Sequence, residues 1–273
     1  MTVRARARGA LKGLLRRATA GLGAAIPGLR GPAEAPRVLC YHGVCDGPPD
    51  EWSVTPAQLR RHMRWIAAHC RPVPLEDIVR AVSGRAALPP RAVAVTFDDG
   101  LRDVFTTAAP ILSDLSIPAA AFVSPGLLDG LRPHTSYAPT RPFMSWDEVR
   151  ALARAGWTIG SHALTHPVLA DLPADEARRE LVESRRALAE RCEREVTLLA
   201  YPYGTRRTVS PRDRRLAAEA GYEAAFLDMT GPLLPGIDLM ALPRNKALGT
   251  DSMTVVRASV SGRMDPWRLV ESR

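Results

Sequence analysis

Short apolar segments alternate with amphipathic segments along most of the chain. Apolar runs such as AVAVTF at Ala92–Phe97 predict strands that are buried on both faces of a parallel sheet. Segments with apolar residues three or four positions apart predict helices between these strands. The predicted strands and helices alternate about six or seven times, which indicates a parallel sheet covered by helices.

The bounds of these elements follow from the apolar runs, from the helical spacing of apolar residues, and from the residues that begin and end helices. The predicted strands are Arg37–Tyr41, Ala92–Phe97, Ala119–Val123 and residues 157–159, 198–201 and 223–226. The predicted helices are Leu75–Val82 and residues 55–69, 103–115, 145–155, 173–192 and 210–221. Thr55, Ser145 and Ser210 are N-cap candidates, since a hydroxyl there accepts a hydrogen bond from the first helical turn.

Polar side chains that are capable of chemistry follow the predicted strands directly. They are His42, Asp98, Asp99, His162, Tyr203 and Asp228. In a parallel barrel the carboxyl ends of the strands converge on one face, and that face carries the active site. We therefore predict an α/β barrel rather than an open sheet.

The charge is concentrated at one end of the chain. Seven of the eight net positive charges come from residues 1–30, which contain no acid, so the remainder is close to neutral. This distribution argues against nucleic acid as a substrate of the folded body. The apolar stretch at 18–29 is too short for a membrane span and is followed by no clear cleavage site. We divide the chain into a leader, residues 1–36, and a catalytic domain, residues 37–273.

The leader allows two interpretations. Leucines interleaved with basic residues favour an amphipathic segment of residues 1–30 on an anionic membrane surface, and the alternative is a disordered segment without function. The four cysteines form no CxxC pair, which favours buried free thiols in a reducing compartment. We therefore expect a protein of the cytoplasm or of the inner membrane face.

Two motifs together predict a metal site. Asp98 and Asp99 are adjacent carboxylates after a strand, where burial without partners is costly, so one can bind a cation while the other reaches a water. His162 and His166 are four positions apart, a spacing that places them on one face of a helical turn and suits a shared ion. Two imidazoles and one carboxylate leave an open position, as in catalytic zinc sites. Either motif alone is also typical of structural residues, whereas the combination favours a metal-dependent hydrolase.

Two further turns contribute candidate residues. Tyr203 lies between Pro202 and Gly204, in a turn whose backbone N–H can face an oxyanion. His42 precedes Gly43 at the end of the first strand and suits a general acid or base. An ordinary turn and a histidine packed under the barrel rim stay open as alternatives.

These motifs resemble those of the polysaccharide deacetylases, the NodB-homology family of carbohydrate esterases. TFDDG at 96–100, SHALTHP at 161–167 and YPYG at 201–204 match three family motifs, and the resemblance covers residues 38–262. It implies a distorted (β/α)7 barrel that removes the acetyl group of an N-acetylated carbohydrate, or more rarely an O-acetyl group.

The resemblance also implies a role for each matched residue. Asp98 is the expected general base, and Asp99, His162 and His166 are the expected ligands of one divalent ion. The ligand set favours Zn²⁺, and Co²⁺, Mn²⁺ or Fe²⁺ fit the same donors. The backbone N–H of Tyr203 is expected to hold the oxyanion together with the ion.

Two departures from the family pattern affect the expected site. Ala200 stands where the family usually has an arginine, and we take Arg244 as its substitute. The late histidine that acts as the general acid is missing, because no histidine follows His166. We predict that His42 replaces it, as in a subset of poly-N-acetylglucosamine deacetylases. The alternatives are another amide or ester hydrolase on this scaffold, and a silent relative that binds metal or glycan without turnover.

Overall fold

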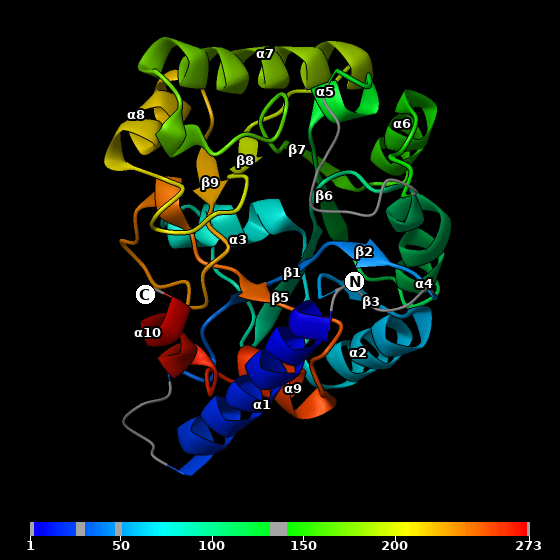
Figure 1. Cartoon of the computed structure of the whole chain (residues 1–273), viewed down its shortest axis with the longest axis vertical. Helices are drawn as coiled ribbons and strands as arrows, with labels where there is room; N and C mark the ends of the chain where they lie inside the picture. Colours follow the sequence, from blue (N-terminus) through cyan, green and yellow to red (C-terminus); the bar gives the residue numbers. More distant parts are fainter. Residues whose placement is uncertain (1–2, 26–30, 47–50, 132–140, 272–273) are drawn as a thin grey trace.

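Parallel strands form one curved sheet that helices surround (Figure 1). The computed structural model describes residues 3–25, 31–46, 51–131 and 141–271. The strands are β1 (Arg37–Tyr41), β2 (Gly43–Val44), β3 (Ser53–Val54), β4 (Arg71–Pro72), β5 (Ala92–Phe97), β6 (Ala119–Val123), β7 (Thr158–Ser161), β8 (Leu198–Ala200), β9 (Ala224–Phe226) and β10 (Asn245–Lys246). The α-helices are α1 (Val3–Ala25), α2 (Pro56–His69), α3 (Leu75–Val82), α4 (Ala109–Ser113), α5 (Pro125–Leu128), α6 (Trp146–Arg154), α7 (Ala174–Cys192), α8 (Pro211–Glu219), α9 (Met253–Val260) and α10 (Arg268–Glu271). Short turns of other helix types are η2 (Val104–Ala108), η3 (Leu169–Asp171), η4 (Leu239–Ala241) and η5 (Asp265–Trp267).

The main sheet follows the order β10–β1–β5–β6–β7–β8–β9, and β4 pairs with β5. The segment before β10 joins the two edges of this sheet. The Leu227 N–H donates to the Leu242 carbonyl over 2.8 Å, and the Leu242 N–H donates to the Ala225 carbonyl over 2.9 Å. The sheet therefore curls into a distorted barrel, and the chain passes from β9 to β10 across its closure.

Alternate residues of the strands pack into two hydrophobic clusters. On β5, Ala92 and Ala94 belong to an inner cluster that also holds Phe122, whereas Val93 and Val95 pack with residues of the surrounding helices. Side chains of a strand alternate between its two faces. The same period therefore directs the side chain of Asp98, just beyond β5, towards the inside of the barrel.

Most predicted element bounds agree with the structure, and the capping boxes at Thr55, Ser145 and Ser210 begin α2, α6 and α8. The predicted helix at 103–115 differs, because it consists of the π-helical turn η2 followed by the short helix α4. Pro110 explains the difference, since it has no N–H and its ring clashes with the carbonyl four residues before it. In the wider turn the N–H of Ala109 reaches the carbonyl of Val104 instead.

The leader contains a helix that neither sequence interpretation included. Helix α1 crosses the chain's C-terminal part and contacts α9 and η5 (Figure 1). Ala20 belongs there to a small hydrophobic cluster that includes residues of α9 and Trp267. At Gly23, a Cβ atom would lie 2.1 Å from the carbonyl oxygen of Arg263, so only glycine allows this close approach. The structure thus differs from a disordered leader over Val3–Ala25, because small residues let the helix pack on the body.

Among the described residues, none of the helices combines the length and the apolar character that crossing a membrane requires. The division of the chain at residue 36 stays a prediction.

Candidate active site

A pocket of about 170 Å³ lies at the carboxyl ends of the strands. The side chains that line it are mostly polar: His42, Trp52, Asp98, Asp99, His162, His166, Tyr201, Tyr203, Thr205, Asp228 and Lys246. Six of the seven site residues that the sequence predicts therefore meet here. The seventh, Arg244, is hydrogen-bonded to one of them, Asp98.

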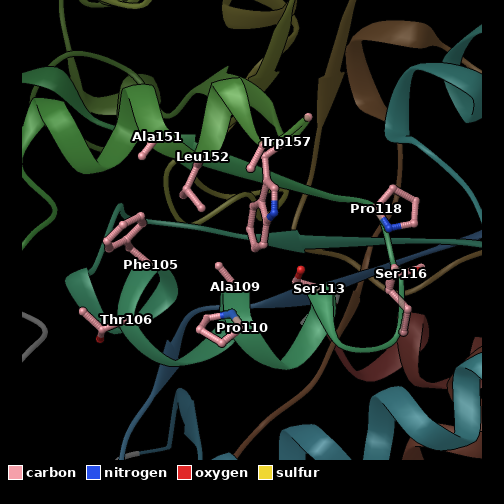
Figure 2. A pocket seen from close by; sticks show the side chains of 13 residues that line it. Phe105, Thr106, Ala109, Pro110, Ser113, Ser116, Pro118, Ala151, Leu152 and Trp157 are labelled. Carbon is pink, nitrogen blue, oxygen red and sulfur yellow. The ribbon is translucent and has the colours of Figure 1, made fainter.

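A larger groove of about 800 Å³ lies at the other end of the barrel (Figure 2). It runs between α4 and α6, and Pro118 and Trp157 mark it as lying just before β6 and β7. In the described part of the chain, the residues that line this groove include no acid and no base. The groups that can perform chemistry are therefore in the smaller pocket.

The Asp99 carboxylate faces two imidazoles. Its Oδ1 lies 3.2 Å from Nε2 of His162 and 3.2 Å from Nε2 of His166, and all three residues are buried. Asp99 has a left-handed backbone conformation, with φ at 73°. In a regular strand Asp98 and Asp99 would point to opposite faces, but after this turn both line the same pocket.

The loop that carries the two histidines is not the helical turn that their spacing suggested. Ala163 and His166 each adopt a left-handed conformation, with φ at 59°, and the loop has no helical residues between them. Glu180 of α7 fastens the loop, since its carboxylate accepts hydrogen bonds from the Thr165 N–H (2.8 Å) and hydroxyl (2.7 Å). The predicted meeting of the histidines is correct, but its cause is a folded loop rather than helix periodicity.

These three side chains fit a divalent metal ion. Nδ1 of His162 must carry a hydrogen, because it lies 2.7 Å from the Ala200 carbonyl oxygen, and this leaves the Nε2 lone pair for a metal. Burial acts to lower the pKa of His162, but the charge of Asp98 and the hydrogen bond and charge of Asp99 together outweigh it and raise that pKa. Surroundings that favour a proton at this position also favour a metal cation. Burial lowers the pKa of His166, which keeps that ring neutral, as a ligand must be.

Arg244 forms a bidentate ion pair with Asp98. Its Nη1 and Nη2 donate to the two carboxylate oxygens over 2.7 and 2.6 Å, and both side chains are buried. Burial acts to raise the pKa of Asp98, but the charge and hydrogen bonds of the guanidinium, together with the nearby imidazoles, outweigh it and hold that pKa below its ordinary value. The structure thus places Arg244, the expected substitute for the arginine missing at Ala200, against the expected general base Asp98.

His42 is half-buried at the pocket, where its ring packs 5.4 Å from the ring of Trp52. A ring nitrogen of His42, a carboxylate oxygen of Asp98 and the Cys40 sulfur lie within 4.8 Å of one another. The Nδ1 atom of His42 is buried and, among the described residues, has no hydrogen-bond partner. His42 therefore lies beside Asp98 in the pocket and also packs at the barrel rim.

Tyr203 occupies a tight turn at the mouth of the pocket. Its φ is 61°, its side chain is 41% exposed, and its ring lies edge-on to His166 at 4.9 Å. The next residue must be glycine, because a Cβ on Gly204 would lie 2.4 Å from the backbone nitrogen of Asp228. The Asp228 N–H also donates to the Gly204 carbonyl over 2.8 Å, which anchors the turn.

Lys246 and Trp52 are among the pocket residues that sequence reasoning missed. Lys246 lines the pocket, and its Nζ lies 3.1 Å from Oδ2 of Asp228. Trp52 forms the wall beside His42. Asp228 could be noticed because it follows a predicted strand, but β10 has only two residues and shows no period that would reveal Lys246.

Comparison with known proteins identifies relatives. Residues 85–225 match the polysaccharide deacetylase family. The chitooligosaccharide deacetylase of Sinorhizobium fredii is 30% identical over 130 residues, which cover 47% of this chain and 54% of that protein. The poly-beta-1,6-N-acetyl-D-glucosamine N-deacetylase of Staphylococcus epidermidis is 22% identical over 205 residues, 71% of this chain and 67% of that protein.

The fold is shared with a solved structure, IcaB from Ammonifex degensii. The TM-score is 0.72 at 21% sequence identity, and the match covers 85% of this chain and 98% of that one. This chain belongs to the polysaccharide deacetylase family. The family resemblance, the distorted (β/α)7 barrel and the class of hydrolase predicted from the sequence are thereby confirmed.

Proposed function

We propose that this protein removes the N-acetyl group from an N-acetylated sugar of a polysaccharide or glycoconjugate and releases acetate and a free amine. The observation that carries this proposal is one pocket in which two adjacent carboxylates have different partners. Asp98 is paired with Arg244, and Asp99 faces His162 and His166. Metal-assisted hydrolysis of an acetamide uses a cation site and a separate base, and the names of the two curated relatives describe deacetylases.

Asp99, His162 and His166 are the residues that would hold the metal ion, and their donor set favours zinc. When bound, such an ion supplies Lewis acidity that polarises the acetyl carbonyl and makes water more acidic. Asp98 accepts a proton from the attacking water, and Arg244 keeps Asp98 ionised and oriented for this step. The Tyr203 N–H donates to the oxyanion that forms when water adds to the carbonyl carbon.

The carbon–nitrogen bond then breaks, and the departing nitrogen needs a proton because an amide anion is too basic to leave. His42 is the proposed donor of this proton. Its contact with Trp52 would hold the ring at the pocket while the sugar binds.

An acetate-release screen tests the proposal. The full chain, loaded with zinc, is offered N-acetylated polymers, lipid-linked sugars and nucleotide sugars, and acetate and free amine are both measured. We expect equal amounts of the two products from at least one class, and loss of both after chelation. Release of acetate without a free amine would instead identify an O-acetyl ester hydrolase, and binding of glycan without any release would identify a silent relative.

We also propose that residues 1–30 contact an anionic membrane. The side of α1 that faces away from the body carries Leu11, Leu14, Leu15 and Leu22, which are 47–62% exposed. Helix α1 has no acidic residue in its sequence, so its charge is complementary to anionic lipid.

A further inference from the structure

A buried arginine of α1 lies behind the wall of the pocket. Arg16 is fully buried, although it belongs to a helix at the surface. Its Nε and Nη2 donate to the two carboxylate oxygens of Asp251 over 2.8 and 2.9 Å, and Nη2 also donates to the Lys246 carbonyl over 2.8 Å. The guanidinium lies over the ring of Trp267 at 5.5 Å. Burial of a charge is costly unless such partners compensate it, so this contact is specific.

The backbone that Arg16 contacts carries two residues of the site. Arg244, the partner of Asp98, lies two positions before Lys246, and Lys246 itself lines the pocket. The Ala247 N–H donates to the Cys40 carbonyl over 2.9 Å, which keeps this segment beside β1.

Asp251 ties the end of the same segment to α1. Its Oδ2 accepts a hydrogen bond from the Leu248 N–H over 3.0 Å and another from Arg16 over 2.9 Å. Beyond Lys246, this buried ion pair joins the segment to a helix that lies more than two hundred residues earlier in the chain. Gly249 of the same segment also accepts a hydrogen bond from the Gln58 side chain over 3.0 Å and donates one to the Glu51 carbonyl over 3.2 Å.

A second contact joins α1 to the opposite part of the wall. Lys12 forms an ion pair with Glu51 and lies over the ring of Trp52 at 5.2 Å. Trp52 in turn packs against His42. This contact is partly exposed to solvent, so it contributes less to the stability of the fold than the buried pair of Arg16 and Asp251.

We infer that Arg16 is a positioning residue of the active site, which fixes the backbone at Lys246 and through it the orientation of Arg244 against Asp98. This inference rests on the proposed function and extends it, since it makes α1 a working part of the catalytic domain. It also predicts that removal of the leader impairs turnover even on a soluble substrate.

The test compares three variants of the full chain: Arg16→Met, Arg16→Lys and, as the matched control, Arg17→Met, whose side chain is exposed on the same helix. For Arg16→Met we expect kcat to fall by about 10-fold or more, because small displacements of reacting groups have effects of this size. Arg16→Lys, which keeps the charge but not the fork of donors, should recover part of the loss. Zinc affinity should stay at the value of the control, because no metal ligand lies on this segment.

Hydrogen exchange gives a readout that needs no substrate. In Arg16→Met the amides of residues 247 and 248 should exchange at least about 10-fold faster than in Arg17→Met, while those of β5 and β7 stay protected. A variant that loses thermal stability yet keeps the exchange pattern, kcat and KM of the control would overturn the inference, since Arg16 would then be structural only. If the native protein releases no acetate from any sugar, the proposed function fails, and exchange together with hydrolysis of 4-nitrophenyl acetate still decides the role of Arg16.

Discussion

The two sides of the pocket are built in different ways. The metal side, which consists of Asp99, His162 and His166, comes from loops that directly follow β5 and β7, and two of its three residues are four positions apart. The base side consists of Asp98 and Arg244, which are 146 residues apart and meet where the barrel closes. The metal side is thus a property of short segments, whereas the base side depends on the correct assembly of the whole barrel. Substitutions on the two sides should separate metal binding from turnover.

The largest effect is expected for Asp99→Asn on the metal side. Asparagine tolerates the left-handed conformation of this position, so the backbone should be kept while the charge is lost. We expect zinc affinity to fall by about 100-fold or more and acetate release to disappear with it. Titration calorimetry with zinc and an acetate assay measure the two quantities. Tight zinc binding by this variant would show that Asp99 is not a ligand.

The neighbouring substitution Asp98→Asn tests the base side with the same change of side chain. We expect zinc affinity within a few-fold of the native value and kcat lower by about 1000-fold, since a general base contributes up to that order. Arg244 then loses its buried anion, so the free energy of unfolding should fall by about 3 kcal/mol. Urea unfolding checks that the variant is still folded during the assay. Full activity in the folded variant would refute the assignment of the base.

The role of His42 as the acid can be tested separately from the metal side and the base side by comparing substrates with different leaving groups. His42→Ala should lower kcat on an N-acetylated sugar by about 100-fold, because the amine needs a proton to leave. Hydrolysis of 4-nitrophenyl acetate should change much less, since its phenolate leaves without one. His69→Ala, an exposed histidine of α2, is the matched control. An equal loss on both substrates would argue that His42 only shapes the pocket.

A smaller effect on zinc affinity is expected for a residue that holds the metal side in place without binding the ion. Glu180→Ala removes the acceptor that fastens Thr165 and thereby loosens the loop that carries His166. Changes in residues that orient ligands lower metal affinity by about 10-fold. Glu190→Ala on the same helix, whose ion pair is solvent-exposed, serves as the control. Unchanged zinc affinity in Glu180→Ala would mean that the loop keeps its shape without α7.

The same contrast explains how much could be predicted from the sequence. The strands and the three motifs could be recognised because each lies within a short stretch of sequence, as an apolar run or as residues at a short spacing. Arg244 was found only as a substitute for a residue missing at Ala200. Alanine rarely adopts a left-handed conformation, so the residue at 163 gave no indication of a turn there. The two histidines were therefore assigned to a helical turn. The docking of α1 was missed because the leucines point outward, whereas the docked side carries Gly13, Arg16, Ala20 and Gly23.

The outward leucines give the last and smallest prediction. Leu15→Ser should weaken binding to anionic vesicles about 5-fold, which corresponds to the loss of roughly 1 kcal/mol of apolar burial. Val270→Ser changes a similarly exposed apolar residue on α10 and should have no effect. Binding is measured by sedimentation with vesicles of anionic and of zwitterionic lipid. Turnover on a soluble sugar should not change, because Leu15 faces away from the pocket that Arg16 supports. Absence of vesicle binding by the native chain would rule out the membrane contact, and a concentration-dependent dimer would point to a second copy on this face instead.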